Sequence, residues 1–127
     1  MSLRSSLGQV RGLGAAKTGA SHFWWQRLTG LALVPLSLWF VISVISLAGA
    51  DYQHFQAWIS IPGNATLMVL TIFAAFYHAQ LGVQVVIEDY VHRQAVKLVS
   101  LILLKFAAAL CALFSAVAVC RVAFVGG

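Results

Sequence analysis

Three long apolar runs, separated by short polar segments, make up most of the 127-residue chain. They cover residues 28–47, 65–87 and 98–124, so each contains at least 20 residues. A helix of about 20 apolar residues spans the ~30 Å hydrocarbon core of a bilayer. The pattern therefore predicts an all-α membrane protein with three transmembrane helices.

The segment before the first run is polar and basic. Residues 1–27 contain four cations, Arg4, Arg11, Lys17 and Arg27, and no acidic residue. Its several glycines favour an irregular conformation. We therefore divide the chain into a basic N-terminal segment, 1–27, and a three-helix membrane anchor, 28–127.

The composition agrees with a membrane protein. Apolar residues make up 61% of the chain and charged residues 9%, with a mean hydropathy of +0.92. Soluble domains carry roughly 25% charged residues, so this chain has too few to cover a surface facing water. We expect membrane lipid around it and no nucleic-acid partner. Cys111 and Cys120 both lie in the third run, where we expect them to be small apolar fillers.

The first apolar run ends at Ala48-Gly49-Ala50, which resembles a signal-peptidase site. The apolar region of a signal peptide is usually about 7–15 residues long, and this run is longer and starts late. We therefore expect a retained span. We also expect no cleaved transit peptide, which favours a bacterial inner membrane over a mitochondrial one.

The Lys and Arg residues of the short segments predict the orientation, since they stay on the cytoplasmic side. The N-terminal segment holds four of them, and the second connection adds Arg93 and Lys97. The first connection, 48–64, which we expect to be a loop, holds none. The N-terminus and the 88–97 region should therefore face the cytoplasm or matrix, and the C-terminus the opposite side.

One histidine, His78, lies near the middle of the second run. Ionisable residues at this depth are functional candidates by default, and neutral imidazole is a common axial ligand of haem iron. Small residues Ala74, Ala75 and Gly82 share its helix face and leave room for a flat macrocycle. A single histidine requires a second ligand from another chain. The alternative is a histidine that hydrogen-bonds across two helices.

Asp89 and Tyr90 lie where the second run ends, roughly 18 Å along a helix from His78. A tyrosine at this position is most often an interface anchor. Beside an acid, and near His92 and Arg93, its hydroxyl is also suited to donate to a ligand carbonyl.

Three further polar residues lie just before or within the spans. His22 and Arg27 precede the first run, where Arg27 is expected to snorkel towards the interface. Lys105 lies about 10 Å inside the third run. We expect it to snorkel as well, with contact to an anionic lipid or a haem propionate as the alternative.

Two motifs in the sequence resemble those of a known family. HFWWQRLTG before the first span and HAQLGVQVVIEDYV across residues 78–91 closely resemble the small D-type membrane-anchor subunit of succinate dehydrogenase, respiratory complex II. The resemblance covers most of the chain, and the 78–91 stretch is its most specific part. The third span is generic.

The resemblance implies a set of roles and partners. His78 would ligate haem b, whose second ligand comes from a C-type cytochrome b anchor subunit. Tyr90 would hydrogen-bond a ubiquinone carbonyl, with Asp89 beside it. Arg27 would lie near the haem propionates and the quinone site, and so would His22, which is one position away from a histidine of some relatives. An iron–sulfur subunit and a flavoprotein subunit would complete the enzyme, in which this chain is a non-catalytic subunit.

Two alternatives remain at the level of sequence. One is the anchor of a quinol:fumarate reductase, which runs the reverse reaction. The other is a small haem-free subunit for membrane transport or assembly. In that case His78 would only tie two helices together, and Tyr90 would be a plain interface anchor.

Overall fold

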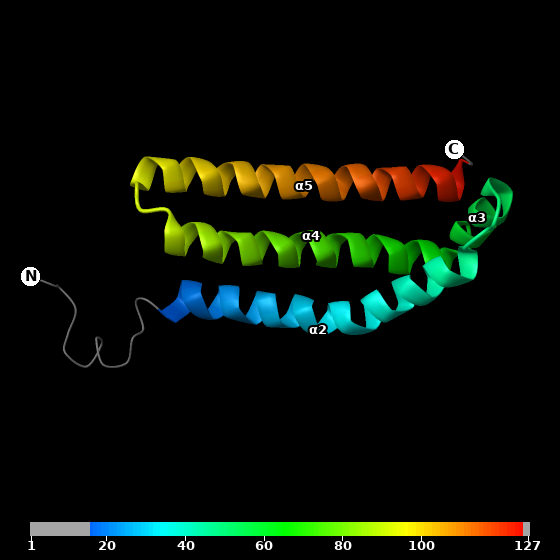
Figure 1. The fold of residues 1–127 in the computed structure, drawn as a ribbon, viewed down its shortest axis with the longest axis horizontal. Coiled ribbons are helices and arrows are strands. Elements are labelled where there is room, and N and C mark those ends of the chain that lie inside the picture. Colours follow the sequence, from blue (N-terminus) through cyan, green and yellow to red (C-terminus); the bar gives the residue numbers. More distant parts are fainter. Residues whose placement is uncertain (1–15, 126–127) are drawn as a thin grey trace, which may run out of the picture.

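The computed structural model describes the backbone of residues 16–125 and the side chains from residue 20 to residue 125. Within this part the fold is all-helical, with α2 (Ala16–Leu47), α3 (Tyr52–Ile59), α4 (Pro62–Tyr90) and α5 (Gln94–Phe124). The three long helices run side by side in alternating directions, with α4 between α2 and α5 (Figure 1). The prediction of an all-α membrane protein is confirmed.

Each long helix is long and apolar enough to cross a membrane. The corresponding stretches are Ala20–Leu47, Pro62–Tyr90 and Gln94–Phe124, and each contains one of the predicted apolar runs. Most large apolar side chains are exposed, as expected for a surface that faces lipid or other membrane subunits. Only a thin core is left between the helices.

Small residues form much of that core. Ala112, Ala116 and Ala123 of α5 are buried, together with Ala65 and Leu81 of α4. Alanine lets the backbones of membrane helices approach closely. The α4–α5 pair is therefore packed largely through short side chains, with Leu81 as a large buried one, and most of the other large side chains are exposed.

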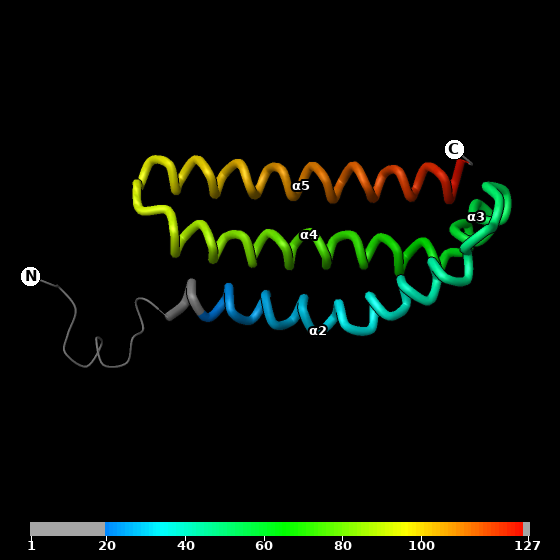
Figure 2. The backbone as a smooth tube through the Cα atoms, in the orientation of Figure 1, coloured from blue at the N-terminus to red at the C-terminus, as the bar shows by residue number. Residues whose placement is uncertain are grey.

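The bends and ends of the helices follow from local chemistry. Pro35 lies inside α2 and deprives the Leu31 carbonyl of its helical partner; the axis of α2 curves beyond its middle (Figure 2). Pro62 occupies the first turn of α4, where a missing N–H costs nothing. Gly49, with φ of 82°, makes the turn after α2.

The short helix α3 corrects the prediction of a loop over 48–64. Asp51 caps it, accepting a hydrogen bond from the His54 backbone N–H at 2.8 Å. The Trp58 ring stacks on Trp39 of α2 with centroids 5.8 Å apart. Ile59 is only 1% exposed, and the Ser60 hydroxyl lies 2.9 Å from the Ala123 carbonyl of α5. Thus α3 joins the ends of the long helices.

Two other boundaries differ from the sequence prediction. The expected irregular conformation of 1–27 is wrong for residues 16–27, which form the first turns of α2, while 1–15 lie outside the described residues. The second connection is shorter than predicted, because α4 continues to Tyr90 and α5 begins at Gln94. Asp89 and Tyr90 are therefore helical.

Candidate functional site

His78 is located near the middle of α4, on the side that faces α2. Its Nδ1 atom lies 3.1 Å from the hydroxyl oxygen of Thr29. A Cβ atom added to Gly30 would lie 3.2 Å from His78 Cε1, so the ring is packed directly against the α2 backbone. The predicted interhelical hydrogen bond is therefore present.

That hydrogen bond uses only one of the two ring nitrogens. The His78 Nε2 atom has no hydrogen-bond partner within the described residues. It is also not enclosed by protein, since the one buried side-chain nitrogen without a partner in this part of the chain belongs to His22. His78 thus makes an interhelical contact through Nδ1 and leaves Nε2 free of hydrogen bonds within the described residues.

The three small residues expected beside His78 have different surroundings. A Cβ added to Gly82 would meet nothing within 4 Å, and Ala75 is exposed. Ala74 lines a shallow, apolar groove of about 400 Å³ between α2 and α4. Leu70, Phe73 and Tyr77 of α4 line the same groove, so the small residues open only part of the surface near His78.

Sequence reasoning missed Thr29 and Gly30. Both occur in the quoted motif HFWWQRLTG, and the glycine among large residues was the only available signal of a close approach. Their contact with His78 depends on which face of α2 meets α4, and this was not predictable from an almost uniformly apolar helix.

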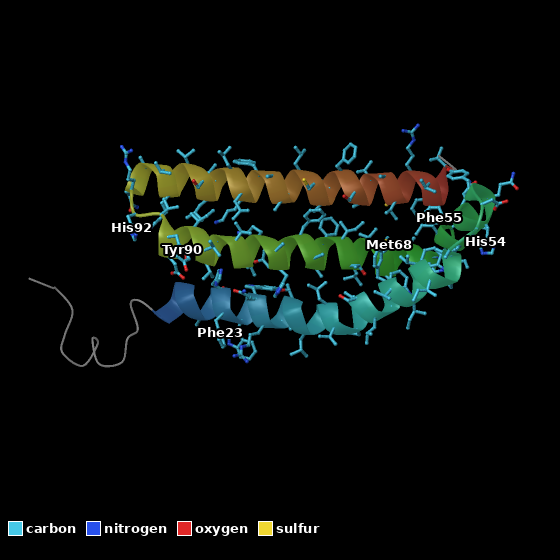
Figure 3. All side chains as sticks on the ribbon, in the orientation of Figure 1. Phe23, His54, Phe55, Met68, Tyr90 and His92 are labelled. Carbon is cyan, nitrogen blue, oxygen red and sulfur yellow. The ribbon has the colours of Figure 1, made fainter. Side chains whose placement is uncertain are left out.

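Asp89 and Tyr90 form the last turn of α4, at the end of the bundle that carries the α4–α5 connection. Figure 3 shows Tyr90 and His92 at this end, and His54 at the opposite end. Tyr90 is 77% exposed, and Asp89 is exposed as well. Neighbouring helix positions point about 100° apart, so these two side chains do not face each other. They are available to a partner or ligand at this rim.

A line of hydrogen-bonded side chains leads from this rim into α4. The Gln84 amide donates to Glu88 at 3.0 Å, and the Gln80 amide donates to Gln84 at 3.0 Å. Gln80 is 7% exposed. It lines a groove of about 430 Å³ between α4 and α5, together with Lys105.

Arg27 lies deeper than the predicted mouth of the first span. Because α2 begins at Ala16, Arg27 is eleven residues into the helix and only two residues from Thr29. At 1.5 Å per residue it is about 3 Å from the level of His78. Its guanidinium lies over the Phe23 ring, 4.6 Å from the centroid. Arg27 is therefore close in depth to His78 and far from Tyr90.

Along the bundle axis, His22 lies between the level of His78 and the end of the bundle that carries Tyr90. It is seven residues before Thr29, about 10 Å along α2, in the half of the helix near the Tyr90 rim. The buried Nε2 atom of His22 has no hydrogen-bond partner in the described structure. A buried nitrogen of this kind costs free energy unless something binds it.

The remaining candidates do not form a second site. Cys111 and Cys120 are free and exposed. Within residues 20–125, His, Cys, Asp and Glu do not gather in groups of three or more that would hold a metal ion. The described residues therefore do not form a complete metal site by themselves.

Known proteins resemble most of this chain. Residues 1–119 match the family model described as succinate dehydrogenase/fumarate reductase transmembrane subunit. The succinate dehydrogenase hydrophobic membrane anchor subunit of Rickettsia conorii is 32% identical over 89 residues, covering 69% of this chain and 71% of that protein. The succinate dehydrogenase membrane anchor subunit of Reclinomonas americana is 27% identical over 101 residues, covering 70% and 77%.

A further relative of the same kind, from Rickettsia felis, is 36% identical over 77 residues, covering 60% of this chain and 64% of that protein. No solved structure matches the chain. The matched residues include both of the motifs HFWWQRLTG and HAQLGVQVVIEDYV and all three long helices up to residue 119. The chain therefore belongs to the family of succinate dehydrogenase and fumarate reductase transmembrane subunits, as a membrane anchor subunit.

Proposed function

We propose that this anchor subunit supplies one axial ligand, His78, to a haem b and forms part of a ubiquinone site at the Tyr90 rim. A C-type cytochrome b anchor subunit supplies the second ligand. Iron–sulfur and flavoprotein subunits oxidise succinate and deliver the electrons. The observation that carries the proposal is the His78 ring, held on one side by Thr29 with its Nε2 atom left without a partner among the described residues.

The residues around His78 fit a haem. Neutral imidazole is a usual iron ligand, and the small residues beside it leave the ring accessible from outside the three helices. Bound haem supplies a centre that takes up and releases one electron. Arg27, about 3 Å from the level of His78, is suited to pair with a propionate carboxylate. His22 is suited to donate to a propionate or to the quinone.

The proposed quinone site lies at the C-terminal end of α4, about 18 Å along the helix from His78. The Tyr90 hydroxyl donates to a quinone carbonyl, and Asp89 passes protons from the adjacent aqueous side. Reduction to the quinol takes two electrons from the iron–sulfur subunit and two protons from that side. Asp89 and Tyr90 point in different directions, so these two side chains cannot enclose a quinone by themselves. In the proposal, partner subunits supply the rest of the pocket.

The orientation follows from the distribution of cations. Arg93 and Lys97 lie near the α4–α5 connection, at the same end of the bundle as the start of α2 (Figure 1). This end faces the cytoplasm by the positive-inside rule, in a bacterial inner membrane. Protons for the quinol are then taken from the cytoplasm.

A second candidate is the anchor of a quinol:fumarate reductase, because the description of the matching family includes both enzymes. The relatives from Rickettsia conorii and Reclinomonas americana are named as succinate dehydrogenase subunits, which favours succinate oxidation. Relative rates with ubiquinone-type and menaquinone-type partners distinguish the two directions.

The haem assignment is tested on the purified complex with a dithionite-reduced minus oxidised visible spectrum. His78→Ala removes the only ligand atom proposed in this chain. Loss of an outer-shell partner alone costs about 10-fold to 100-fold in metal affinity, so we expect the b-type haem signal per flavin to fall at least about tenfold. His92→Ala is the matched control, since His92 is exposed and outside the spans, and it should keep the signal. Unchanged haem in His78→Ala would overturn the assignment.

A further inference from the structure

The hydrogen-bond partners of Thr29 bear on which ring nitrogen of His78 carries the proton. The Thr29 hydroxyl oxygen lies 2.7 Å from the Trp25 carbonyl oxygen, 3.2 Å from the Gln26 carbonyl oxygen and 3.1 Å from His78 Nδ1. Carbonyl oxygens only accept hydrogen bonds. The hydroxyl has one proton to donate and two acceptors within its own helix.

Two arrangements are possible for a neutral imidazole. If Nδ1 carries the proton, it donates to the Thr29 oxygen, and the hydroxyl donates to Trp25 at its shortest contact. If Nε2 carries the proton, the hydroxyl must turn to Nδ1, and Nε2–H is left without an acceptor among the described residues. The first arrangement makes one more hydrogen bond and leaves no unpaired donor. Unpaired donors are costly in a membrane, so the first arrangement is favoured.

Gly30 fixes the ring from a second direction. A Cβ atom at this position would be 3.2 Å from Cε1, 3.7 Å from Nδ1 and 4.0 Å from Nε2. A contact of 3.2 Å is tighter than ordinary van der Waals contact, so an added methyl group would displace the ring by a few tenths of an ångström. Hydrogen alone at Gly30 lets the imidazole lie against α2.

We propose that Thr29 and Gly30 are positioning residues that preset His78 for iron. Thr29 holds the proton on Nδ1, which leaves the lone pair on Nε2, and Gly30 provides the space in which the ring keeps its orientation. The inference rests on the proposed function, because it concerns the same ligand. An Nδ1–H donated to an oxygen also makes a histidine ligand more basic, which favours the oxidised iron.

The test is a redox titration of the haem in the purified complex carrying Thr29→Val. This substitution keeps the branched shape and removes the oxygen. We expect the preference for oxidised over reduced haem to fall about tenfold, which is an upward shift of about 59 mV in midpoint potential for one electron. Thr29→Ser should restore the native potential.

Thr71→Val is the matched control. The Thr71 hydroxyl donates to the Leu67 carbonyl at 2.7 Å, the same intrahelical bond as in Thr29, without contact to His78. Equal potentials in Thr29→Val and Thr71→Val would overturn the inference. If Thr29→Val holds no haem, the Thr29→Ser variant tests the inference instead. Haem at the native potential in Thr29→Ser would support a positioning role for Thr29, and absence of haem in Thr29→Ser would overturn that role.

Gly30→Ala tests the second contact. We expect a change in the low-temperature electron paramagnetic resonance signal of the ferric haem, because the ring must move. Gly82→Ala is the control, since a Cβ there meets nothing within 4 Å. Identical signals in the two variants would remove Gly30 from the inference. Retention of haem in His78→Ala would instead refute the proposed function itself.

Discussion

The two ring nitrogens of His78 have different surroundings in this protein. Its Nδ1 atom holds α4 to α2 through Thr29, while its Nε2 atom has no partner in the described chain. The sequence presented the helix contact and the haem ligand as alternatives. The structure makes them compatible, because each task uses a different nitrogen.

Tyr90 offers a separate test at the residue scale. Tyr90→Phe removes a hydroxyl that is proposed to hydrogen-bond the quinone, so quinone reduction should slow roughly tenfold. Succinate oxidation measured with an artificial dye should persist, since that acceptor does not need the anchor. Tyr77→Phe is the control: Tyr77 packs edge-on against Trp25 within the bundle. Equal loss of both activities in Tyr90→Phe would indicate failed assembly and refute the assignment.

Residue depth was only partly predictable from the sequence. The position of His78 within an apolar run placed it near the bilayer centre, and it lies near the middle of α4. Arg27 was expected at the mouth of the first span, yet α2 begins eleven residues earlier. Glycines in the basic segment suggested an irregular chain, but isolated glycines are tolerated in a helix at a cost of ~1 kcal/mol each.

The long helices and the short helix differ in how well the sequence predicted them. Runs of 20 or more apolar residues are a strong signal, because only a helix satisfies every backbone polar group in lipid. The eight residues of α3 give no such signal. Their helix depends on the Asp51 cap and on packing of Trp58 and Ile59 against other helices, and these contacts exist only in the folded bundle.

The role of α3 can be measured through its buried residue. Ile59 is 1% exposed, so Ile59→Ala should destabilise the bundle by about 2–5 kcal/mol. Thermal unfolding of the complex in detergent, followed by circular dichroism, would show this as a lower midpoint. Ile61→Ala is the matched control, because Ile61 is 53% exposed. Equal midpoints for the two variants would show that α3 does not stabilise the ends of the long helices.

At the scale of the whole molecule, the three helices form an incomplete unit. Large apolar side chains cover the outside of all three, and the described residues hold no cluster that binds a metal unaided. Under the proposed function, His78 would fill one axial position of the haem and a second chain would fill the other. This proposal agrees with membership of a family of transmembrane subunits.

The central claim, that His78 is an axial haem ligand completed by a partner subunit, is tested most directly by the near-infrared magnetic circular dichroism of the ferric haem. This spectrum depends on the chemical type of both axial ligands. In the native complex we expect the band of two imidazole ligands. His78→Met should move it to the histidine–methionine position, and His92→Met should not. A bis-imidazole band that persists in His78→Met would contradict the claim.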